Sequence, residues 1–334
     1  MANVLQVHAA EDIGVGNVIL AVLPYFHIYG LTVAMNLGLY VGATQVVFRK
    51  FEVDLYIRCL EKYRATHLYI APPIAIALTK NPDSVLKYQR DSVKKIKSGA
   101  APMGRELQND MMKVFPTAHM RQGYGLTETS PVTHLQPHGS TMMGSIGKLL
   151  SNTEARIVDP ISKEDLGTGL EGELWLRGPQ VMLGYQKAED TAKVMEPDSW
   201  FKTGDIAKYN EDGYFFITDR LKELIKVKGF QVAPAELESL LLSHPDVQDA
   251  VVFGVPHEFD GEVPKAHIQL KASVKPSVEK AMEIQAYVVN VVSSYKQLRG
   301  GVRFVETIPK SASGKLLRRL SRDIEKISAE KETI

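Results

Sequence analysis

The first 135 residues alternate between short apolar runs and longer amphipathic stretches, and this alternation constrains the fold more than any other feature. Residues 51–64 repeat apolar side chains at helical spacing, and residues 105–114 also fit a helix. Before and between these helices, β-branched and apolar runs predict strands at 17–23, 44–48, 67–70 and 93–98. Because strand–helix–strand repetition is typical of a parallel sheet with helical crossovers, we predict an α/β region here.

Two further regions follow with different patterns. From residue 145 to 218, short strands alternate with turns, which predicts a small antiparallel unit resembling a barrel, with strands at 155–158, 173–177, 205–209 and 214–218. Beyond residue 223, Pro234 suits a first helical turn and precedes a stripe of leucines. We expect a separate α+β domain there, with a helix at 278–292 and strands at 250–255, 266–270 and 302–305.

The composition excludes several classes of protein. Hydrophobic residues make up 44% of the chain and charged residues 24%, which is typical of a packed globular protein. The 40 basic and 39 acidic residues nearly cancel, so we expect no nucleic-acid partner. Cys59 is the only cysteine, which excludes an intrachain disulfide and favours a reducing compartment, the cytoplasm. No apolar run is long enough to span a membrane.

Neither end of the sequence resembles a targeting signal. Glu11 and Asp12 precede the first basic residue, Arg49, so we expect no secretory signal. The last residues, Lys-Glu-Thr-Ile, differ from the Ser-Lys-Leu type of peroxisomal signal.

One segment combines glycines, a hydroxyl and a carboxylate: Arg121-Gln122-Gly123-Tyr124-Gly125-Leu126-Thr127-Glu128-Thr129. Glycine has no Cβ and reaches positive φ at little cost, so the backbone at Gly123 and Gly125 could approach a nucleotide closely. Thr127 could bind a phosphate, Glu128 could bind Mg²⁺, and Tyr124 offers a flat face to a purine. An ordinary glycine turn is the alternative, and a lone G-x-G does not exclude it.

Two other segments carry candidate ligands for a phosphorylated molecule. Asp205 follows a Thr-Gly turn, where its carboxylate either accepts both hydroxyls of a ribose or closes an Asx turn. Lys222, Lys226 and Lys228 share one face if their segment is extended, since side chains alternate along a strand. Such a row either binds a polyanion or forms a solvated strand edge that lysine protects from aggregation.

Two single residues also have alternative interpretations. Lys315 follows a turn of small residues at the predicted start of a helix, where a phosphate could bind, although an ordinary loop lysine has the same pattern. His27 lies among aromatic residues, and a histidine in such company is more often packed in a core than catalytic. No His/Cys cluster has the spacing of a zinc site.

Seven motifs in a fixed order, between Asn3 and Arg319, give the chain a specific resemblance: LPYFHIYG, KSGAAPMG, RQGYGLTET, GELWLRGP, TGDIA, DRLKELIKVKGFQVAPAELE and PKSASGK. The series resembles the adenylate-forming enzymes, which include acyl- and aryl-CoA synthetases, 4-coumarate–CoA ligases and firefly luciferases. The resemblance implies part of a large AMP-binding domain over residues 1–219, with its β-rich unit at about 140–219. A hinge at 220–222 and a small mobile α+β domain at 223–334 would follow.

The resemblance also implies roles for individual residues. In the nucleotide site, Glu128 is similar to the family's magnesium ligand, and Asp205 and Arg220 are similar to its ribose-binding pair. The residues similar to those that contact adenine and phosphate are Gln122, Gly123, Tyr124, Gly125 and Thr127. His27 resembles the residue that gates the family's thiol tunnel. Four residues resemble those that line the acyl pocket: Tyr29, Ala100, Pro131 and Val132.

The remaining roles separate two half-reactions. Lys315 resembles the lysine that stabilises charge during adenylation, and Lys222 the hinge. Lys222, Lys226 and Gln231 also resemble the residues that contact the acyl-adenylate in the second step, and Lys50, Lys228 and Gly229 resemble residues that contact coenzyme A. The implied partners are ATP (or AMP), Mg²⁺, coenzyme A and a small carboxylic acid. The acid would attack the α-phosphorus of ATP and release pyrophosphate, and the thiol would then attack the acyl-adenylate.

The sequence departs from the family pattern in one respect. The Ser/Thr/Gly-rich phosphate loop that ends in Pro-Lys-Gly is absent, and Asn3–Gln6 resembles a segment that ordinarily follows that loop. We therefore expect these 334 residues to adenylate poorly and to expose an apolar sheet face. Family members can occur in peroxisomes, and the pattern indicates neither the oligomeric state nor the acid.

Three functions remain open from the sequence. The first is an acyl- or aryl-CoA ligase, since Pro131-Val132 resembles the CoA ligases more than the luciferases. The second is a non-catalytic protein that binds an adenylate or coenzyme A. The third is an enzyme that passes the acyl group to a carrier-protein thiol, which the coenzyme A-like Lys228-Gly229 pair disfavours.

Overall fold

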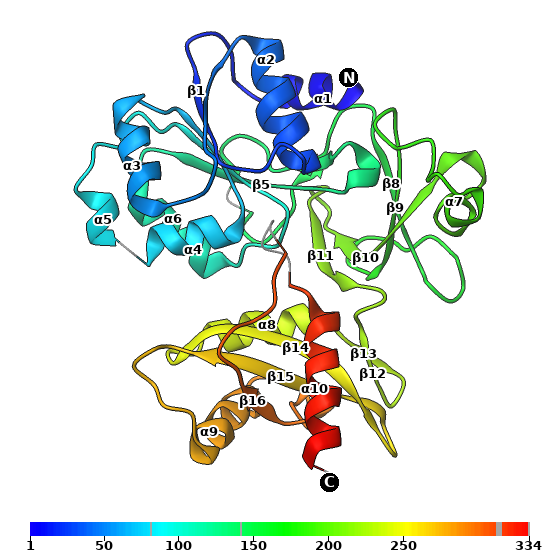
Figure 1. Cartoon of the computed structure of the whole chain (residues 1–334). Coiled ribbons are helices and arrows are strands. Elements are labelled where there is room, and N and C mark those ends of the chain that lie inside the picture. The colour runs from blue at the N-terminus through cyan, green and yellow to red at the C-terminus, as the bar shows by residue number, and fades with distance from the viewer. Residues whose placement is uncertain (81, 141, 312–315, 333–334) are drawn as a thin grey trace. The chain divides into compact units, whose positions relative to one another are not determined.

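The structure, a computed structural model, describes residues 1–80, 82–140, 142–311 and 316–332 (Figure 1). The chain divides into two compact units. Unit 1 comprises Met1–Thr203 and Ala207–Ile217, and unit 2 comprises Gly204–Ile206 and Thr218–Ile334. Among the described residues, no helix combines the length and apolar character that crossing a membrane requires.

Unit 1 contains a seven-stranded sheet in the order β2-β1-β3-β4-β5-β6-β7. The predicted parallel sheet is confirmed for β2 (Thr44–Val47), β1 (Val18–Ala21), β3 (His67–Ile70) and β4 (Lys95–Ser98). A fifth parallel strand, β5 (His119–Gly125), was not predicted and includes residues that the sequence analysis treated as a glycine loop. The last two strands, β6 (Val132–Leu135) and β7 (Lys148–Leu149), pair antiparallel, so the complete sheet is mixed.

Helices pack around the parallel strands and bury a common apolar core (Figure 1). The predicted helices are α3 (Val53–Lys62) and α6 (Arg105–Val114). The sequence analysis missed α4 (Pro72–Thr79), which begins with two prolines because a first turn does not need their missing N–H groups. It also missed a π-helix at Tyr29–Asn36 and three short helices, α1 (Ala2–Ala10), α2 (Leu37–Val41) and α5 (Pro82–Leu86).

The expectation of an exposed apolar sheet face is wrong for the described residues. Strands β1, β3 and β4 are buried almost throughout, because helices and loops of unit 1 cover them. Exposed apolar side chains near these strands include Leu5 of α1, Leu39 and Tyr40 of α2, and Val47 of the edge strand β2. Their exposed fractions are 46% at Leu5, 69% at Leu39, 50% at Tyr40 and 62% at Val47.

The β-rich region forms a four-stranded sheet in the order β11-β10-β9-β8. Its strands are β8 (Glu154–Val158), β9 (Gly172–Arg177), β10 (Phe201–Tyr209) and β11 (Phe215–Arg220), and α7 (Ala188–Val194) lies between β9 and β10 in sequence. The barrel-like unit expected here is thus a sheet with two separate edges. A bridge between Gly147 and Phe215 joins its β11 edge to the chain beside β7.

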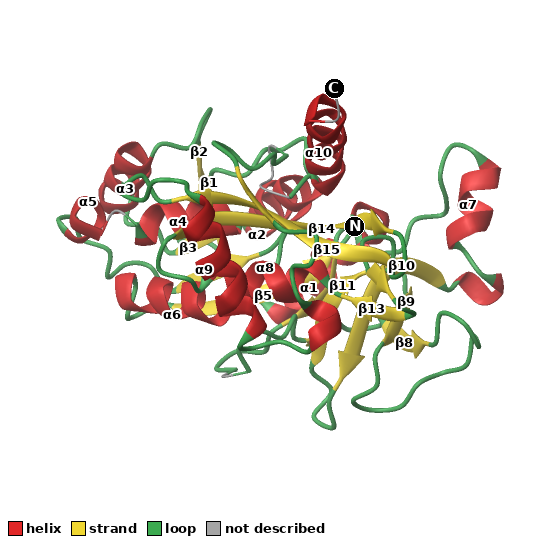
Figure 2. Cartoon of the chain, turned by 90° about the horizontal axis from the view of Figure 1, so that it is seen from below, coloured by secondary structure: helices red, strands yellow, loops and turns green. Residues whose placement is uncertain are grey.

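Unit 2 is built on the long antiparallel pair β14 (Val247–His257) and β15 (Gly261–Leu270). Ala250, Val252, Ala266 and Ile268 form one face and bury α8 (Pro234–Leu242) and α9 (Val278–Val289), since side chains alternate along each strand. His267 and Lys265 belong to the opposite face and pair with Glu325 of α10 (Arg318–Glu332). Figure 2 shows α10 on the opposite side of these strands from α8 and α9.

Shorter strands complete unit 2. The hairpin of β12 (Ile225–Val227) and β13 (Phe230–Val232) pairs with β15 through β12, and β16 (Val302–Phe304) adds in parallel to β15. Ser277 caps α9 by accepting a hydrogen bond from the Lys280 N–H at 3.1 Å. The predicted α+β composition of this region is confirmed.

Candidate active site

Strand β5 carries the glycine motif, and its glycines serve strand packing. Neither Gly123 nor Gly125 has a positive φ, which corrects the conformational argument made from the sequence. A Cβ added to Gly125 would lie 1.9 Å from the Pro131 carbonyl oxygen, and one on Gly123 would lie 3.3 Å from Leu135 Cδ1. The chain therefore needs glycine at 125 because β5 and the start of β6 approach so closely.

Gln122 ties β5 to the loop that follows β4. Its Oε1 accepts the Met103 N–H at 3.1 Å, and its Nε2 donates to the Met103 carbonyl at 3.2 Å. Both ends of the amide are thus engaged by protein backbone, and the residue is 6% exposed. Direct contact of this amide with adenine stays a prediction, and the observed role is to hold a loop in which Ala100 has a positive φ of 71°.

Tyr124 belongs to an aromatic cluster that reaches from β5 to β11. Its ring lies edge-on to His134 at 5.7 Å, and His134 lies 4.6 Å from the ring of Phe215. Burial lowers the pKa of His134 to about 3, so this imidazole is neutral at physiological pH. The packed side of Tyr124 is therefore apolar and uncharged.

The turn after β5 presents a hydroxyl and a carboxylate. Thr127–Thr129 form one turn of 3₁₀ helix in which Thr127 is exposed and Glu128 is partly buried. Glu128 Oε1 accepts a hydrogen bond of 2.7 Å from the hydroxyl of Tyr185, which the sequence analysis did not identify. The carboxylate offers an oxygen ligand of the type Mg²⁺ prefers.

The predicted acyl-pocket residues come from separate segments and are held by different contacts. The Tyr29 hydroxyl donates to the Lys97 carbonyl at 3.0 Å, and the Tyr29 ring lies against Gly99, where a Cβ would be 3.1 Å away. Asn3 holds the backbone of Val132 from both directions, at 3.0 Å and 2.6 Å. Pro131 supplies the carbonyl that faces Gly125.

Two other predicted residues lie near the surface of unit 1. His27 accepts a hydrogen bond from the Tyr29 N–H at 3.2 Å, and partial burial lowers its pKa, which favours a neutral ring. Lys50 is exposed and pairs loosely with Glu52 at 4.0 Å. Among the described residues, neither side chain makes a hydrogen bond or ion pair with the Gln122–Glu128 segment.

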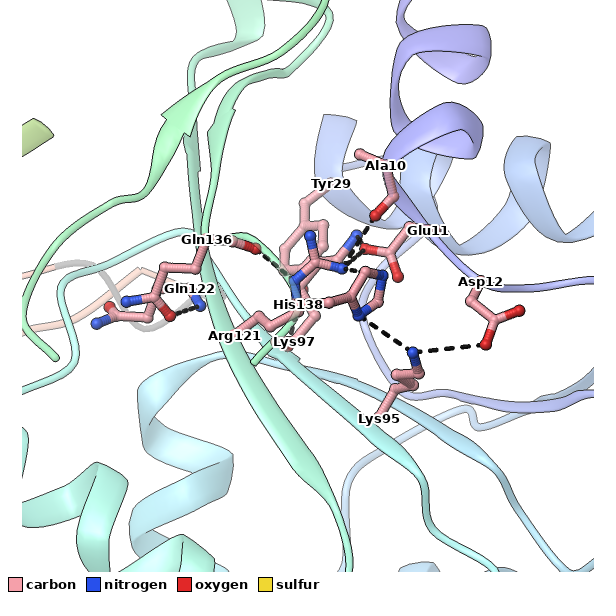
Figure 3. A network of polar contacts seen from close by, with 10 residues as sticks. All are labelled: Ala10, Glu11, Asp12, Tyr29, Lys95, Lys97, Arg121, Gln122, Gln136 and His138. Carbon is pink, nitrogen blue, oxygen red and sulfur yellow. Dashed lines mark hydrogen bonds and ion pairs between the residues drawn. The ribbon is translucent and has the colours of Figure 1, made fainter. Parts of the chain in front are cut away.

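Behind β5 lies a buried ionic cluster that the sequence analysis missed (Figure 3). Glu11 pairs with both Lys97 of β4 and Arg121 of β5, the latter at 3.4 Å. Burial alone would raise the pKa of Glu11, but the two cations lower it below its usual value. Arg121 also donates to the Gln136 carbonyl at 2.5 Å and to the Ala10 carbonyl at 3.1 Å. The cluster thereby fixes the strand that carries the motif.

Within unit 2, the two predicted ribose-binding residues lie together. Arg220 Nε is 3.0 Å from Asp205 Oδ1, and Asp205 is 3% exposed. The neighbouring Asp219 turns the other way and accepts the Ala235 N–H at 2.8 Å, at the start of α8. Desolvation raises the pKa of Asp219, although these backbone hydrogen bonds oppose the shift. Asp219 is therefore structural, while the pair beside it remains a candidate for the nucleotide.

The expected single row of lysines is wrong because the segment is not extended throughout. Lys222 lies in a turn between β11 and β12, and Lys228 adopts a positive φ of 49° before Gly229 at 82° in the next turn. Only Lys226 lies in a strand, directly opposite Gln231 in the hairpin. Lys228 pairs with Asp260 at 3.2 Å. Of the three predicted contacts to acyl-adenylate, Lys226 and Gln231 are thus side by side and exposed, whereas Lys222 lies apart from the hairpin in its own turn.

One further group of side chains has the spacing of a cation site, namely His244, Asp246 and Glu283. Lys280 already pairs with Asp246 at 2.8 Å and with Glu283 at 2.6 Å. A lysine ammonium thus supplies the positive charge there, and the group is a poor candidate for a metal. Lys315, the predicted adenylation lysine, lies outside the described residues.

Comparison with known proteins decides the family. The model of the AMP-binding enzyme family matches residues 1–186, which is more than half of the chain. The chain belongs to this family. The AMP-binding enzyme C-terminal domain matches residues 236–315, within unit 2.

Individual relatives agree with the family assignment. Probable 4-coumarate–CoA ligase 2 of Dictyostelium discoideum is 45% identical over 90% of this chain and 54% of its own length. The chain spans about half the length of the curated relatives it matches. The fold matches ATP-bound MatB from Rhodopseudomonas palustris with a TM-score of 0.87 and 26% identity, covering 97% of this chain and 63% of that one.

A second solved structure is o-succinylbenzoate coenzyme A synthetase (MenE) from Bacillus subtilis, in complex with ATP and a magnesium ion. It is 27% identical, with a TM-score of 0.84 over 95% of this chain and 64% of that chain. The adenylate-forming fold expected for this AMP-binding enzyme is therefore confirmed.

Proposed function

We propose that the chain carries the nucleotide- and thiol-handling surfaces of an AMP-forming acyl- or aryl-CoA ligase of the 4-coumarate–CoA ligase-like type. The observation that carries the proposal is the Gln122–Glu128 segment, a firmly held strand that ends in a turn with an exposed hydroxyl and an anchored carboxylate. The 45% identity to a probable 4-coumarate–CoA ligase supports the reaction class.

In the first step, residues of unit 1 would bind and orient ATP. Tyr124 would stack its ring on the adenine, Thr127 would donate to a phosphate oxygen, and Glu128 would bind Mg²⁺. Glu128 fits this role because Tyr185 holds one carboxylate oxygen, and the other makes no hydrogen bond among the described residues. When bound, Mg²⁺ would offset negative charge on the phosphates. Orientation and positive charge, including that of Lys315, would lower the barrier to attack by the carboxylate.

Unit 2 would bind the ribose in both steps and would supply further side chains in the second step. Asp205 would accept hydrogen bonds from the ribose hydroxyls while Arg220 holds its carboxylate. Lys226 and Gln231, adjacent in the hairpin, would contact the acyl-adenylate, and Lys228 with Gly229 would face coenzyme A. We further propose that rotation at Lys222 exchanges the Lys315 side for the Lys226 side between the two steps.

The acid itself would be a flat aryl acid or a medium-length acyl chain. The support is the buried Tyr29 ring, which packs against Gly99 beside the loop that carries Ala100. The alternative function is a non-catalytic protein that binds AMP, acyl-adenylate or coenzyme A. Tight binding of AMP without turnover would favour this alternative.

Separate assays of the two half-reactions test the proposal. The purified chain receives synthetic 4-coumaroyl-adenylate or an aliphatic acyl-adenylate together with coenzyme A, and thioester formation is followed by chromatography. We expect thioester to form, because this step does not require the phosphate loop, and we expect weak carboxylate-dependent exchange of pyrophosphate into ATP. Binding of AMP without any thioester would favour the non-catalytic alternative.

Two lysine variants sharpen this test. Lys226→Ala should lower the thioester rate by at least about tenfold if the side chain orients the adenylate. Lys315→Ala should leave the same rate largely unchanged, because its role lies in adenylation. Lys163→Ala, at an exposed turn of unit 1, is the control. Equal losses in the Lys226 and Lys315 variants would contradict the assignment of one lysine to each step.

A further inference from the structure

A tyrosine from a distant part of unit 1 fixes the carboxylate that the proposed function assigns to Mg²⁺. The Tyr185 hydroxyl donates to Glu128 Oε1 at 2.7 Å across 57 residues of sequence. In addition, the Met182 N–H donates to the Glu128 carbonyl at 2.8 Å. Residues 182–185 therefore hold both the backbone and the side chain of Glu128.

Tyr185 is itself anchored by α7. Thr191 Oγ1 accepts the Tyr185 N–H at 2.8 Å, and its methyl and hydroxyl groups lie against Gly184. A Cβ on Gly184 would be only 2.7 Å from Thr191 Oγ1, so the turn can pack on the threonine only with glycine at this position. The path from α7 to the carboxylate thus runs through Thr191 and Tyr185 to Glu128.

Packing alone does not account for this arrangement. Tyr185 is 41% exposed, so its ring contributes little to the core of unit 1. Its hydroxyl nevertheless meets one carboxylate oxygen at an ideal distance, and the other oxygen makes no hydrogen bond among the described residues. A carboxylate held by one oxygen loses rotational freedom before a metal arrives, which lowers the cost of ordering it on binding.

We propose that Tyr185, held in place by Thr191, is a positioning residue that orients the Glu128 carboxylate and presents its second oxygen to the metal of a metal–nucleotide complex. This inference rests on the proposed function, in which Glu128 binds Mg²⁺. Tyr185 touches neither metal nor nucleotide and acts only through Glu128.

Metal binding by the Tyr185→Phe variant of the full 334-residue chain tests the inference. Mn²⁺ serves as the probe, and its free concentration is measured by electron paramagnetic resonance in the presence of the ATP analogue with an α,β-methylene bridge, which attack on the α-phosphorus does not cleave. We expect the Mn²⁺ dissociation constant to rise about tenfold, in the range typical for loss of a partner that orients a metal ligand. Affinity for AMP measured without metal should not change.

Four variants complete the design. Tyr88→Phe is the matched control, because Tyr88 also donates to a carboxylate, that of Asp54 at 3.3 Å, elsewhere in unit 1. Thr191→Val should weaken Mn²⁺ binding in the same direction but by a smaller factor, whereas Thr191→Ser should keep the affinity of the unaltered chain. Glu128→Gln should weaken Mn²⁺ binding at least as much as Tyr185→Phe.

The outcomes separate this inference from the proposed function. Unchanged Mn²⁺ affinity in Tyr185→Phe, with a loss in Glu128→Gln, overturns the inference alone. Unchanged affinity in Glu128→Gln overturns the metal role of Glu128 and the inference with it. If the unaltered chain binds no Mn²⁺–nucleotide, hydrogen exchange decides: the amides of residues 127–129 should exchange faster in Tyr185→Phe than in Tyr88→Phe, and equal exchange overturns the positioning role.

Discussion

The two units treat charged side chains in opposite ways. In unit 1, Glu11, Lys97 and Arg121 form a cluster whose side chains are at most 5% exposed. In unit 2, Lys226 is exposed in the β12–β13 hairpin, and the Lys228 side chain is 60% exposed although it pairs with Asp260. Charges removed from water depend on their partners for stability, whereas exposed charges are screened by solvent.

This difference separates residues that build a site from residues that meet its ligands. The buried cluster fixes β5, so its members are unavailable to a substrate and their loss should unfold unit 1. The hairpin lysines hold little of the fold in place, which leaves them available for an anionic ligand. Lysines that look alike in the sequence therefore have different functions because their surroundings differ.

Breaking the buried cluster should have the largest effect. Glu11→Gln leaves Lys97 and Arg121 buried without their counter-charge, and we expect a loss of about 3–5 kcal/mol in the free energy of unfolding of unit 1. Urea unfolding followed by tryptophan fluorescence measures this loss selectively, because both tryptophans, Trp175 and Trp200, belong to unit 1. Glu52→Gln, at an exposed pair with Lys50, is the control and should change little. A similar small change in both variants would remove the contrast between the units.

The second effect concerns the close approach of β5 and β6. Gly125→Ala places a Cβ 1.9 Å from the Pro131 carbonyl oxygen, so the backbone must shift, and we expect a loss of about 1–3 kcal/mol in the same assay. Gly167→Ala is the control, since no atom lies within 4 Å of its Cβ position. Full stability in Gly125→Ala would mean that β6 can move away freely and that the glycine serves another purpose.

The sequence predicted regular helices and strands better than it predicted turns and helix starts. The helix expected at 105–114 is α6, because the residues that it buries recur at helical spacing. Helix α4 was missed because Pro72-Pro73 reads as a break, although prolines fit a first turn. The lysine row failed because its segment turns at residues 221–223, and no alternation pattern marks a turn between charged residues.

The candidate site was predicted only where its contacts are local. Asp205 and Arg220 follow from motifs that the fold brings together in neighbouring strands. Tyr185, in contrast, meets Glu128 across 57 residues, and the Glu11 cluster joins three separate segments. Such pairs depend on the complete fold of unit 1, so no spacing in the chain encodes them.

The third effect depends on pH and arises from His134 in the aromatic cluster. Burial lowers its pKa in the folded chain to about 3, below the usual value of about 6.5 expected in the unfolded chain. Between these two values the unfolded chain binds the additional proton, so stability is complete above pH 6.5 and falls as the pH decreases. We expect His134 to contribute a slope of about 1.4 kcal/mol per pH unit below that point.

His134→Phe should remove this contribution and flatten the pH dependence of unit 1 between pH 6.5 and 5. The measurement is urea unfolding by tryptophan fluorescence at several pH values, compared with His119→Phe at an exposed position of β5. If His134→Phe keeps the original slope, the histidine is not neutral in the folded chain, and the apolar surroundings of Tyr124 need another explanation.

The smallest effect on stability should come from the hairpin. Lys228→Ala removes one of the cations around Asp260, but Arg299 still pairs with that carboxylate. We expect urea unfolding of unit 2, followed by hydrogen exchange in β14 and β15, to differ little from Lys271→Ala at an exposed turn of the same unit. Affinity for coenzyme A should nevertheless fall, and its dependence on salt should weaken, because one fewer exposed charge meets the phosphates. A loss of stability as large as that in Glu11→Gln would instead make Lys228 part of the folded framework, and the contrast between buried and available cations would then fail at the residue where the two roles lie closest together.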